Sequence, residues 1–214
     1  MTVIAIDGPA ASGKSSVSRR IASALGFAVV NSGALYRAVT REMILRGIDV
    51  SHPNDVEREL PHLGLVCKAT PDADCEVRTA SSIDGSQLRD ESVNSLVSGY
   101  AALPAVRKFV NAELHRVASV QSVVMEGRDI GTAVFPETPF KIYIDASPEV
   151  RNARRAREGL SDRIAERDRL DSSRPADPLR VAAGAFVLDT SNLDLDQVCA
   201  LVLAHLASLG LSSR

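Results

Sequence analysis

The residues with the clearest chemistry lie near the N-terminus, in the run Gly-Pro-Ala-Ala-Ser-Gly-Lys-Ser that begins at Gly8. This run matches the pattern G-x-x-x-x-G-K-[ST], in which glycines let backbone N–H groups turn toward phosphate oxygens. Lys14 would place a positive charge at the β- and γ-phosphates, and the Ser15 hydroxyl would face Mg²⁺. The pattern predicts binding of a nucleoside triphosphate such as ATP but leaves the reaction open. The residues expected to contact ATP are Gly8, Pro9, Ala10, Ala11, Ser12, Gly13, Lys14, Ser15 and Ser16.

A second group suited to phosphate chemistry is a cluster of arginines in the last third of the chain. The basic residues are 21 arginines and four lysines, and eight of the arginines lie between Arg151 and Arg174. A guanidinium fork binds two phosphate oxygens at once, which a lysine ammonium cannot do. The alternative is a solvated helix face in which arginines alternate with acidic residues. That alternative accounts for single members such as Arg151 or Arg157 better than for all eight.

Short strands and helices must position these residues, and the hydrophobic pattern indicates where they lie. The apolar run Val3–Ile6 is typical of a buried strand, and a helix with one apolar face follows the glycine-rich run as far as Gly26. A strand at Phe27–Val30 leads into a helix at Gly33–Arg46. Further strands are expected at Ser122–Met125, Phe140–Ile144 and Ala185–Leu188, and a final helix at Asp194–Leu209. Strands that alternate with helices predict an α/β fold with a mostly parallel sheet.

Two regions interrupt this alternation. Between about Leu63 and Leu88 the pattern becomes β-like, and Asp84-Gly85 between two short runs is a hairpin signal. We expect a small antiparallel insertion there. The segment from Pro148 to Pro178 is highly charged and lacks a continuous apolar stripe, which predicts helices that face solvent.

Composition and charge exclude several classes of protein. The chain has 214 residues, 45% hydrophobic and 24% charged, which is typical of one globular domain with insertions. Its net charge of −2 argues against bulk binding of nucleic acid or of an anionic membrane. Neither a signal peptide nor an apolar run of transmembrane length is recognised, and the spacing of Cys67, Cys75 and Cys199 predicts neither a disulfide framework nor a zinc site. We expect a monomer in the cytoplasm.

The triphosphate-binding pattern is shared by switch GTPases, motor ATPases and small-molecule kinases. The sequence contains neither the N-K-x-D nor the D-x-x-G pattern of the GTPases, and motor ATPases are usually longer. A kinase needs cations around the transferred phosphoryl group and a second site for the acceptor. The arginine cluster could supply those cations, and the insertions could supply the acceptor site.

Four sets of residues together resemble the bacterial cytidylate kinase family. They are Ile6–Pro9 with Ser12–Ser15, Ser32–Arg37, Glu126–Pro136, and Glu166–Asp168 with Asp171–Arg174. They follow the family's order over almost the whole chain, and Ser-Gly-Ala-Leu-Tyr-Arg and Gly-Arg-Asp-Ile-Gly-Thr are far more specific than the glycine-rich run. The resemblance implies a nucleoside monophosphate kinase that transfers the γ-phosphoryl group of MgATP to CMP or dCMP, giving ADP and CDP or dCDP.

The resemblance also implies how the chain is divided. It implies a P-loop NTPase-type parallel five-stranded sheet flanked by helices, with a core formed by residues 1–31, 116–147 and 179–214. An NMP-binding region would span residues 32–115 and include the β insertion at about 63–88. A short helical LID would span residues 148–178.

Roles for individual side chains follow from the same resemblance. Clamps on the CMP phosphate would be Arg37, Arg128 and Arg174. Readers of the cytosine base would be Ser98, Arg107 and Asp129. The other members of the CMP site would be Ser32, Tyr36, Arg167 and Asp171, the last two as ribose contacts. The residues expected to act in catalysis are Lys14, Arg128, Arg167 and Arg174.

The expected Mg²⁺ site consists of Ser15, which would bind the ion together with ATP, and Glu126, which would act through water. Asn31 departs from the family, which often carries Asp just before the Ser-Gly pair, so one charge near the ion is missing. Arg154 and Arg163 are further candidates for the ATP phosphates. The other four arginines of the cluster are expected to form a solvated helix face. They are Arg151, Arg155, Arg157 and Arg169.

Three alternatives stay open at this point. A uridylate or broader pyrimidine kinase would share most of these residues, and so would a P-loop kinase for another small acceptor. A non-catalytic ATP-binding module is the alternative outside the enzymes. The presence of Lys14, Ser15 and the arginines argues against the non-catalytic module.

Overall fold

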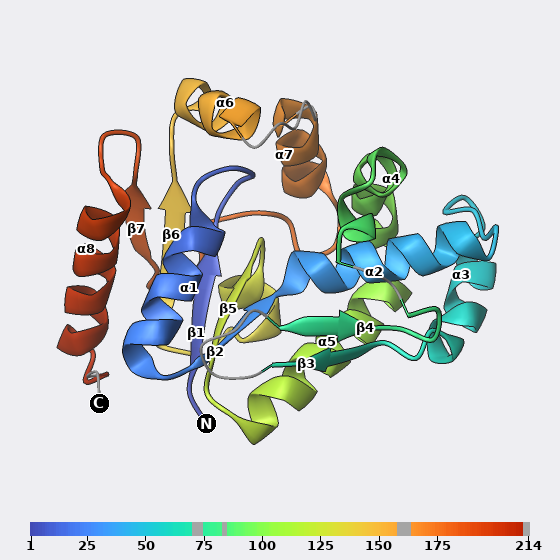
Figure 1. Cartoon of the computed structure of the whole chain (residues 1–214), viewed down its shortest axis with the longest axis horizontal. Coiled ribbons are helices and arrows are strands. Elements are labelled where there is room, and N and C mark those ends of the chain that lie inside the picture. Colours follow the sequence, from blue (N-terminus) through green and yellow to red (C-terminus); the bar gives the residue numbers. More distant parts are fainter. Residues whose placement is uncertain (70–74, 83–84, 158–163, 212–214) are drawn as a thin grey trace.

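A five-stranded parallel sheet forms the centre of the protein (Figure 1). The computed structural model describes residues 1–69, 75–82, 85–157 and 164–211, apart from the side chains of Ile164 and Arg167. The strand order is β2-β5-β1-β6-β7. The strands are β1 (Val3–Asp7), β2 (Ala28–Asn31), β5 (Val123–Gly127), β6 (Lys141–Asp145) and β7 (Phe186–Asp189). The predicted α/β class and all five predicted strands are confirmed.

Helices cover both faces of this sheet because its central strands are apolar on both sides. On one face, Ile4 and Ile6 of β1 pack against α1 (Lys14–Leu25) and α8 (Leu195–Ser208). On the other face, Ala5 packs with residues of α2 (Ser32–Leu45) and α5 (Pro104–Val120). All three β1 residues are fully buried, as expected for the middle strand of a parallel sheet.

A second group of elements extends from the α2 side of the sheet (Figure 1). It comprises α3 (Pro53–Glu59), η1 (Leu60–His62), β3 (Val66–Lys68), β4 (Glu76–Arg78), η2 (Gln87–Arg89) and α4 (Glu91–Ala102). Strands β3 and β4 pair antiparallel, which confirms the predicted antiparallel insertion.

The strands predicted on either side of Asp84-Gly85 are wrong within the described residues, which leave out Ile83 and Asp84. The backbone N–H and the hydroxyl of Ser81 donate to the Glu42 carboxylate, so the segment before Asp84 is bonded to α2 rather than to a neighbouring strand. The segment after Gly85 forms the 3-10 helix η2, in which Leu88 is buried among the side chains that pack on α2.

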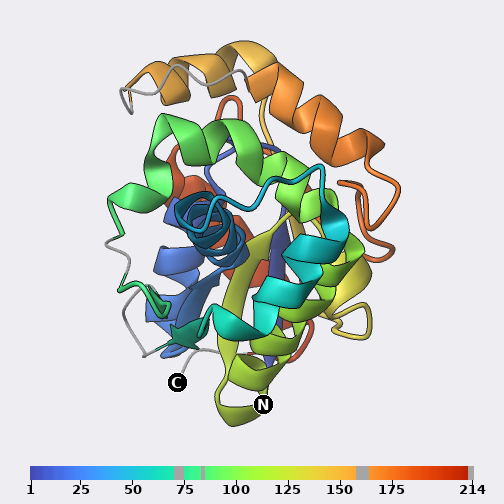
Figure 2. The ribbon, with the colours of Figure 1, turned by 90° about the vertical axis from the view of Figure 1, so that its right-hand side faces the viewer.

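Two charged helices, α6 (Pro148–Arg157) and α7 (Ile164–Ser173), lie above the carboxyl ends of the strands (Figure 1). Figure 2 shows both helices crossing the same end of the molecule as α4. The helical prediction for this segment is confirmed within the described residues. Among those residues, no helix has the length and apolar character needed to cross a membrane.

A π-helical turn, η3 (Ile130–Val134), follows β5 and was not predicted. The buried Asp7 carboxylate at the end of β1 accepts hydrogen bonds from the backbone N–H groups of Ile130 (2.9 Å) and Gly131 (2.7 Å). Burial raises the pKa of Asp7 to about 6, against the opposing effect of these two bonds. Asp7 therefore fixes the segment that carries residues 128 and 129.

Candidate functional site

The glycine-rich run forms the loop between β1 and α1, at the carboxyl end of the central strand. Ligands of open parallel sheets bind at this edge, where neighbouring strands lead to opposite faces. Gly8 has a φ of 149°, and a Cβ added there would lie 2.0 Å from the Ile144 carbonyl oxygen. The close approach of loop and β6 therefore requires glycine at this position.

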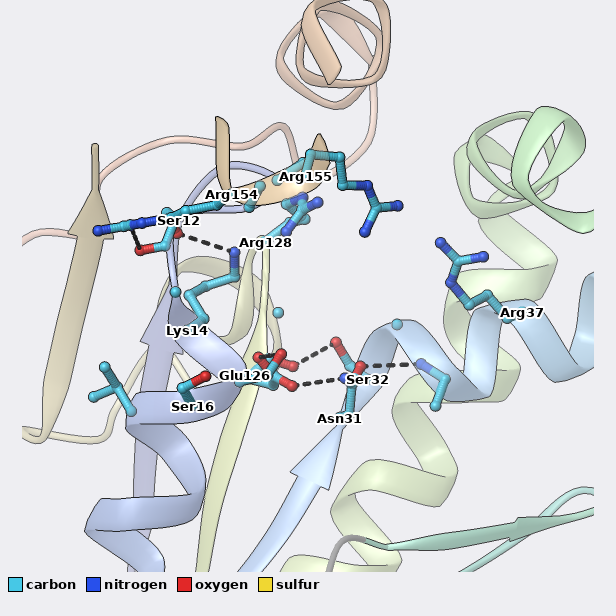
Figure 3. Close-up of a pocket in the computed structure, with 18 of the residues that line it drawn as sticks. Ser12, Lys14, Ser16, Asn31, Ser32, Arg37, Glu126, Arg128, Arg154 and Arg155 are labelled. Carbon is cyan, nitrogen blue, oxygen red and sulfur yellow. Dashed lines mark hydrogen bonds between the residues drawn. The ribbon is translucent and has the colours of Figure 1, made fainter. Parts of the chain in front are cut away.

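Lys14 begins α1 and is buried under the loop, with 7% of its surface exposed. Its ammonium donates a hydrogen bond to the Pro9 carbonyl oxygen at 2.5 Å and lies 3.4 Å from the Ser12 hydroxyl. Burial, followed by the nearby Arg128 charge, lowers the pKa of Lys14 to about 7. Figure 3 shows the side chain curled back beneath the loop.

Glu126, on the neighbouring strand β5, links the loop to the start of α2. Its Oε2 accepts from the Ser15 hydroxyl at 2.9 Å, and its Oε1 accepts from the Asn31 amide at 2.6 Å (Figure 3). Asn31 also caps α2, because its side-chain oxygen accepts from the Ala34 N–H at 3.1 Å. The amide of Asn31 thus performs both tasks, whereas a carboxylate at this position could not donate to Glu126. Burial raises the pKa of Glu126.

A buried network of two arginines and an aspartate lies across the cleft from the loop. The Asp129 carboxylate accepts from the Arg174 guanidinium at 3.1 Å through one oxygen and from Arg107 through the other. All three residues are less than 10% exposed. The Arg107 guanidinium also lies 5.7 Å from the centre of the Tyr36 ring, a cation–π arrangement. Buried charges of this kind are stable only when paired, which the network achieves.

Two further arginines connect this region to its surroundings. Arg37, on α2, donates to the Leu88 carbonyl oxygen at 3.0 Å and to the Asn94 side chain at 2.6 Å. Arg128 donates to the Gly8 carbonyl oxygen at 3.0 Å and to the Asp171 carboxylate at 2.9 Å. Arg128 thus joins the phosphate loop to α7.

The helices α6 and α7 contact the phosphate loop directly. The Asp168 carboxylate accepts from the Ala10 N–H at 3.0 Å, and Arg151 donates both to Asp168 and to the Ala10 carbonyl oxygen. Arg154 donates to the Ser12 carbonyl oxygen at 3.0 Å and to Thr190. The expectation that Arg151 belongs to a solvated helix face is wrong, because Arg151 is half-buried between its ion-pair partner and the loop.

One cleft of about 800 Å³ is bordered both by the phosphate loop and by Asp129 and Arg174 of the buried network. It is lined by the loop from Ala10 to Ser16 and by most of the residues expected to bind CMP. Those residues are Ser32, Tyr36, Arg37, Ser98, Arg128, Asp129, Asp171 and Arg174. Figure 3 shows the side chains of Arg37, Arg128 and Arg155 directed into the space between the loop and α2. Arg155 is half-buried and lines the cleft, so the expected solvated face does not hold for it. Arg157 and Arg169 are exposed, as expected, although Arg157 also borders the cleft.

Several predicted residues lie elsewhere. Gly8 and Pro9 do not line the cleft, and they form the base of the loop through their carbonyl oxygens. Arg107 lies behind Asp129 and Tyr36 and contacts both of them. Arg163 and the side chain of Arg167 lie outside the described part of the chain.

Other cleft residues were missed at the sequence level. Asn94 lies on α4 with no motif around it, and its role as a partner of Arg37 depends on how α2 and α4 pack. Thr190, Leu193, Asp194, Leu195 and Val198 also line the cleft, and the Thr190 hydroxyl donates to the Ser12 carbonyl oxygen of the phosphate loop at 3.2 Å. The position of the Thr190 segment follows from the place of β7 at the edge of the sheet, which no local sequence pattern reveals.

Comparisons with known proteins agree with this geometry. A family model described as cytidylate kinase matches residues 4–208. A cytidylate kinase of Thermus thermophilus is 44% identical over 213 residues, covering 95% of this chain and 98% of the relative. One of Pelotomaculum thermopropionicum is 40% identical over 222 residues, covering 96% of both chains. The crystal structure of an uncharacterized protein from Eubacterium ventriosum has a TM-score of 0.51 at 11% identity, covers 97% of this chain and 99% of its own, and supports the fold alone.

Proposed function

The chain belongs to the cytidylate kinase family, and we propose that it transfers the γ-phosphoryl group of ATP to CMP, forming ADP and CDP. It is an ATP-dependent nucleoside monophosphate kinase, and dCMP is a second acceptor in this proposal. The observation that supports the proposal best is the single cleft that joins the phosphate loop to the buried network around Asp129. A donor and an acceptor would share this cleft.

On the donor side, the loop from Gly8 to Ser16 would hold the triphosphate. The N-terminus of α1 supplies backbone N–H groups and a positive dipole end. Lys14 would leave the Pro9 carbonyl oxygen and turn to the β- and γ-phosphates. Arg154 already contacts the loop at Ser12 and would add positive charge beside those phosphates.

On the acceptor side, Arg37, Arg128 and Arg174 would clamp the CMP phosphate. The acceptor phosphate and the triphosphate repel each other, so positive charge between them is needed for their approach. Ser32 and Tyr36 would line the nucleotide pocket. Arg167 and Asp171 would contact the ribose hydroxyl groups.

The cytosine base would be read by Asp129, Arg107 and Ser98. The amino group of cytosine is a donor for a carboxylate or hydroxyl oxygen, and its ring N3 and O2 are acceptors for a guanidinium. Uracil reverses the pattern at N3 and at position 4, so uracil would leave the polar groups of the pocket unpaired. Such mismatches in a buried site discriminate strongly between substrates.

Mg²⁺ fits the residues present beside the loop. The Ser15 hydroxyl and the Glu126 carboxylate, 2.9 Å apart, offer the hard oxygen ligands that Mg²⁺ prefers. When bound, the ion would neutralise charge on the β- and γ-phosphates. Ser15 would bind it directly, and Glu126 would act through water.

Two moving parts would complete the site in this proposal. Residues 32–115 would act as the NMP-binding region and residues 148–178 as the LID, on a core formed by residues 1–31, 116–147 and 179–214. Their closure would exclude water, which competes as a phosphoryl acceptor, and would align the CMP phosphate oxygen with the γ-phosphorus. No strong general base is required, because the acceptor oxygen is already ionised. Lys14, Arg128, Arg167 and Arg174 would stabilise the charge that spreads over the transferred group.

The experiment that tests the proposal offers the purified protein MgATP with one acceptor at a time and measures ADP release. The acceptors are AMP, GMP, CMP, dCMP and UMP. We expect the highest kcat/KM for CMP and dCMP. A higher kcat/KM for UMP would favour a uridylate kinase, and ADP release that no acceptor increases would favour a non-catalytic ATP-binding module.

A further inference from the structure

Asp177 holds two of the arginines at the acceptor side of the cleft, although no sequence motif includes it. Its carboxylate accepts from Nε of Arg107 at 2.7 Å, and its backbone carbonyl oxygen accepts from Nε of Arg174 at 2.7 Å. The same two arginines meet again at Asp129 through their terminal Nη2 atoms. The four residues therefore form a closed ring from α5, the end of β5 and the segment after α7.

Asp177 and Asp129 bind different nitrogen atoms of the two guanidinium groups. Asp177 binds both guanidinium groups at the Nε atom, next to the side-chain stem, and Asp129 binds both at the outer Nη2 atom. Arg107 is also held at Nη1, which donates to the Ala101 carbonyl oxygen at 3.2 Å, so Nη2 is the nitrogen that a change of partner at Asp129 would release. If Asp129 and the outer nitrogens turn to a nucleotide, Asp177 still holds each arginine in place.

The backbone of Asp177 indicates that this position is constrained. Its φ is 49°, in the left-handed region where aspartate is one of the few side-chain-bearing residues found, and the proline that follows it favours an extended backbone instead. A conformation of this kind persists where the surroundings require it. Here it directs the carboxylate toward Arg107 and the carbonyl oxygen toward Arg174.

We propose that Asp177 is a positioning residue for the acceptor, which fixes Arg107 for recognition of the base and Arg174 for recognition of the phosphate. The inference rests on the proposed function. Asp177 is not among the residues that line the cleft, so it would act through the two arginines. Its removal should weaken binding of the acceptor and relax the choice between cytosine and uracil, while ATP binding stays unchanged.

Two substitutions test this role without straining the backbone. Asp177→Asn removes the charge and Asp177→Gly removes the whole side chain, and both residues tolerate a φ of 49°. Asp177→Gly removes the hydrogen bond to Nε of Arg107, and Asp177→Asn keeps an oxygen acceptor without the negative charge, whereas the backbone carbonyl oxygen that accepts from Arg174 remains in both. We therefore expect KM for CMP to rise about tenfold in Asp177→Gly and by a smaller factor in Asp177→Asn. The preference for CMP over UMP, measured as a ratio of kcat/KM values, should fall in the same order. KM for ATP should match the wild type.

The matched control is Asp55→Asn, because Asp55 also pairs with an arginine, Arg58 at 2.7 Å, but lies on α3 outside the residues that line the cleft. This variant should keep wild-type KM values for both substrates. Calorimetric titration of each variant with CMP alone measures acceptor binding without turnover.

The outcomes separate the two claims. A lower melting temperature or a lower kcat in Asp177→Gly, with an unchanged KM for CMP and an unchanged preference over UMP, would overturn the positioning role alone. Wild-type protein without CMP-dependent turnover would overturn the proposed function, and the positioning role with it.

Discussion

Several cationic side chains of the cleft already donate to carbonyl and carboxylate oxygens of the protein, so a substrate that binds them must replace existing contacts. Lys14 donates to Pro9, Arg174 donates to Asp129, and Arg128 donates to Gly8 and Asp171. The net gain from each new phosphate contact is therefore smaller than its gross strength, because a protein hydrogen bond is given up. The advantage of this arrangement is that the cationic groups are held close to their working positions before substrates arrive.

The lowered pKa of Lys14 leads to a prediction about protons. With a pKa of about 7 in the free protein, Lys14 is mostly neutral at pH 8, and a triphosphate beside it would raise that pKa and return the proton. ATP binding at pH 8 should therefore take up a large fraction of one proton. Calorimetric titration in buffers of different ionisation enthalpy measures this uptake, which Lys14→Ala should abolish. Equal apparent enthalpies in all buffers with the wild type would contradict the prediction.

Asp129→Asn tests recognition of the base. The side-chain amide keeps the shape of Asp129 but adds a donor that suits O4 of uracil, so kcat/KM for CMP should fall roughly 30-fold, or about 2 kcal/mol, while that for UMP falls less or rises. The KM for ATP should change little. Steady-state kinetics with both acceptors provide the measurement. An equal loss for CMP and ATP would mean that Asp129 serves the fold rather than the base.

At the scale of elements, the strands and helices of the core could be predicted from the sequence because each has a strong local pattern. The apolar run of β1 and the single apolar face of α1 fix both their type and their burial. The position of the small sheet was also predictable, but the course of the chain after it, at Ser81 and at η2, was not. Glu42, a buried carboxylate on α2, bonds Ser81 and so decides where that segment lies. This contact joins residues 39 positions apart, and no local signal describes it.

The junction of β5 and α2 also depends on a close contact between elements. A Cβ added at Gly127 would lie 2.6 Å from the Ser32 hydroxyl and 2.8 Å from the Ile130 side chain. Gly127→Ala should therefore cost about 1–3 kcal/mol of stability and lower the melting temperature by several degrees. Thermal unfolding followed by circular dichroism measures the change.

Gly99→Ala is the matched control for that substitution. Gly99 lies within α4, and a Cβ there would meet only the Val50 side chain at an ordinary distance of 3.4 Å. Because alanine favours helices over glycine, this variant should be as stable as the wild type or slightly more stable. Similar losses in both variants would show that the contact at Gly127 is not the cause.

At the scale of the whole molecule, the sheet brings the candidate residues together from distant parts of the chain. Asn31, Glu126 and the phosphate loop all lie at the carboxyl ends of adjacent parallel strands, where this type of fold binds its ligands. The candidate site was therefore largely predictable once the strands were placed and the family resemblance was noted. The contacts of α6 and α7 with the phosphate loop could not be predicted, because the sequence of a charged helix without an apolar stripe does not indicate which surface it packs against.

The near-neutral net charge of the chain agrees with a cleft in which arginines are paired with carboxylates. A net charge of −2 hides a local concentration of arginines around one cleft, and several of them are paired with carboxylates of the same region. This pairing limits the cost of bringing many like charges together in a partly buried space. Two phosphate-bearing substrates would then find cations that acidic side chains already orient.

The most direct test of the central claim follows the phosphoryl group itself. The protein is incubated with Mg²⁺, ATP labelled in its γ-phosphoryl group, and CMP, and the nucleotides are separated by chromatography. We predict that the label appears in CDP at the rate at which ADP forms, with little label in inorganic phosphate. Label that remains in ATP, or that passes to inorganic phosphate at the same rate with or without CMP, would contradict the account.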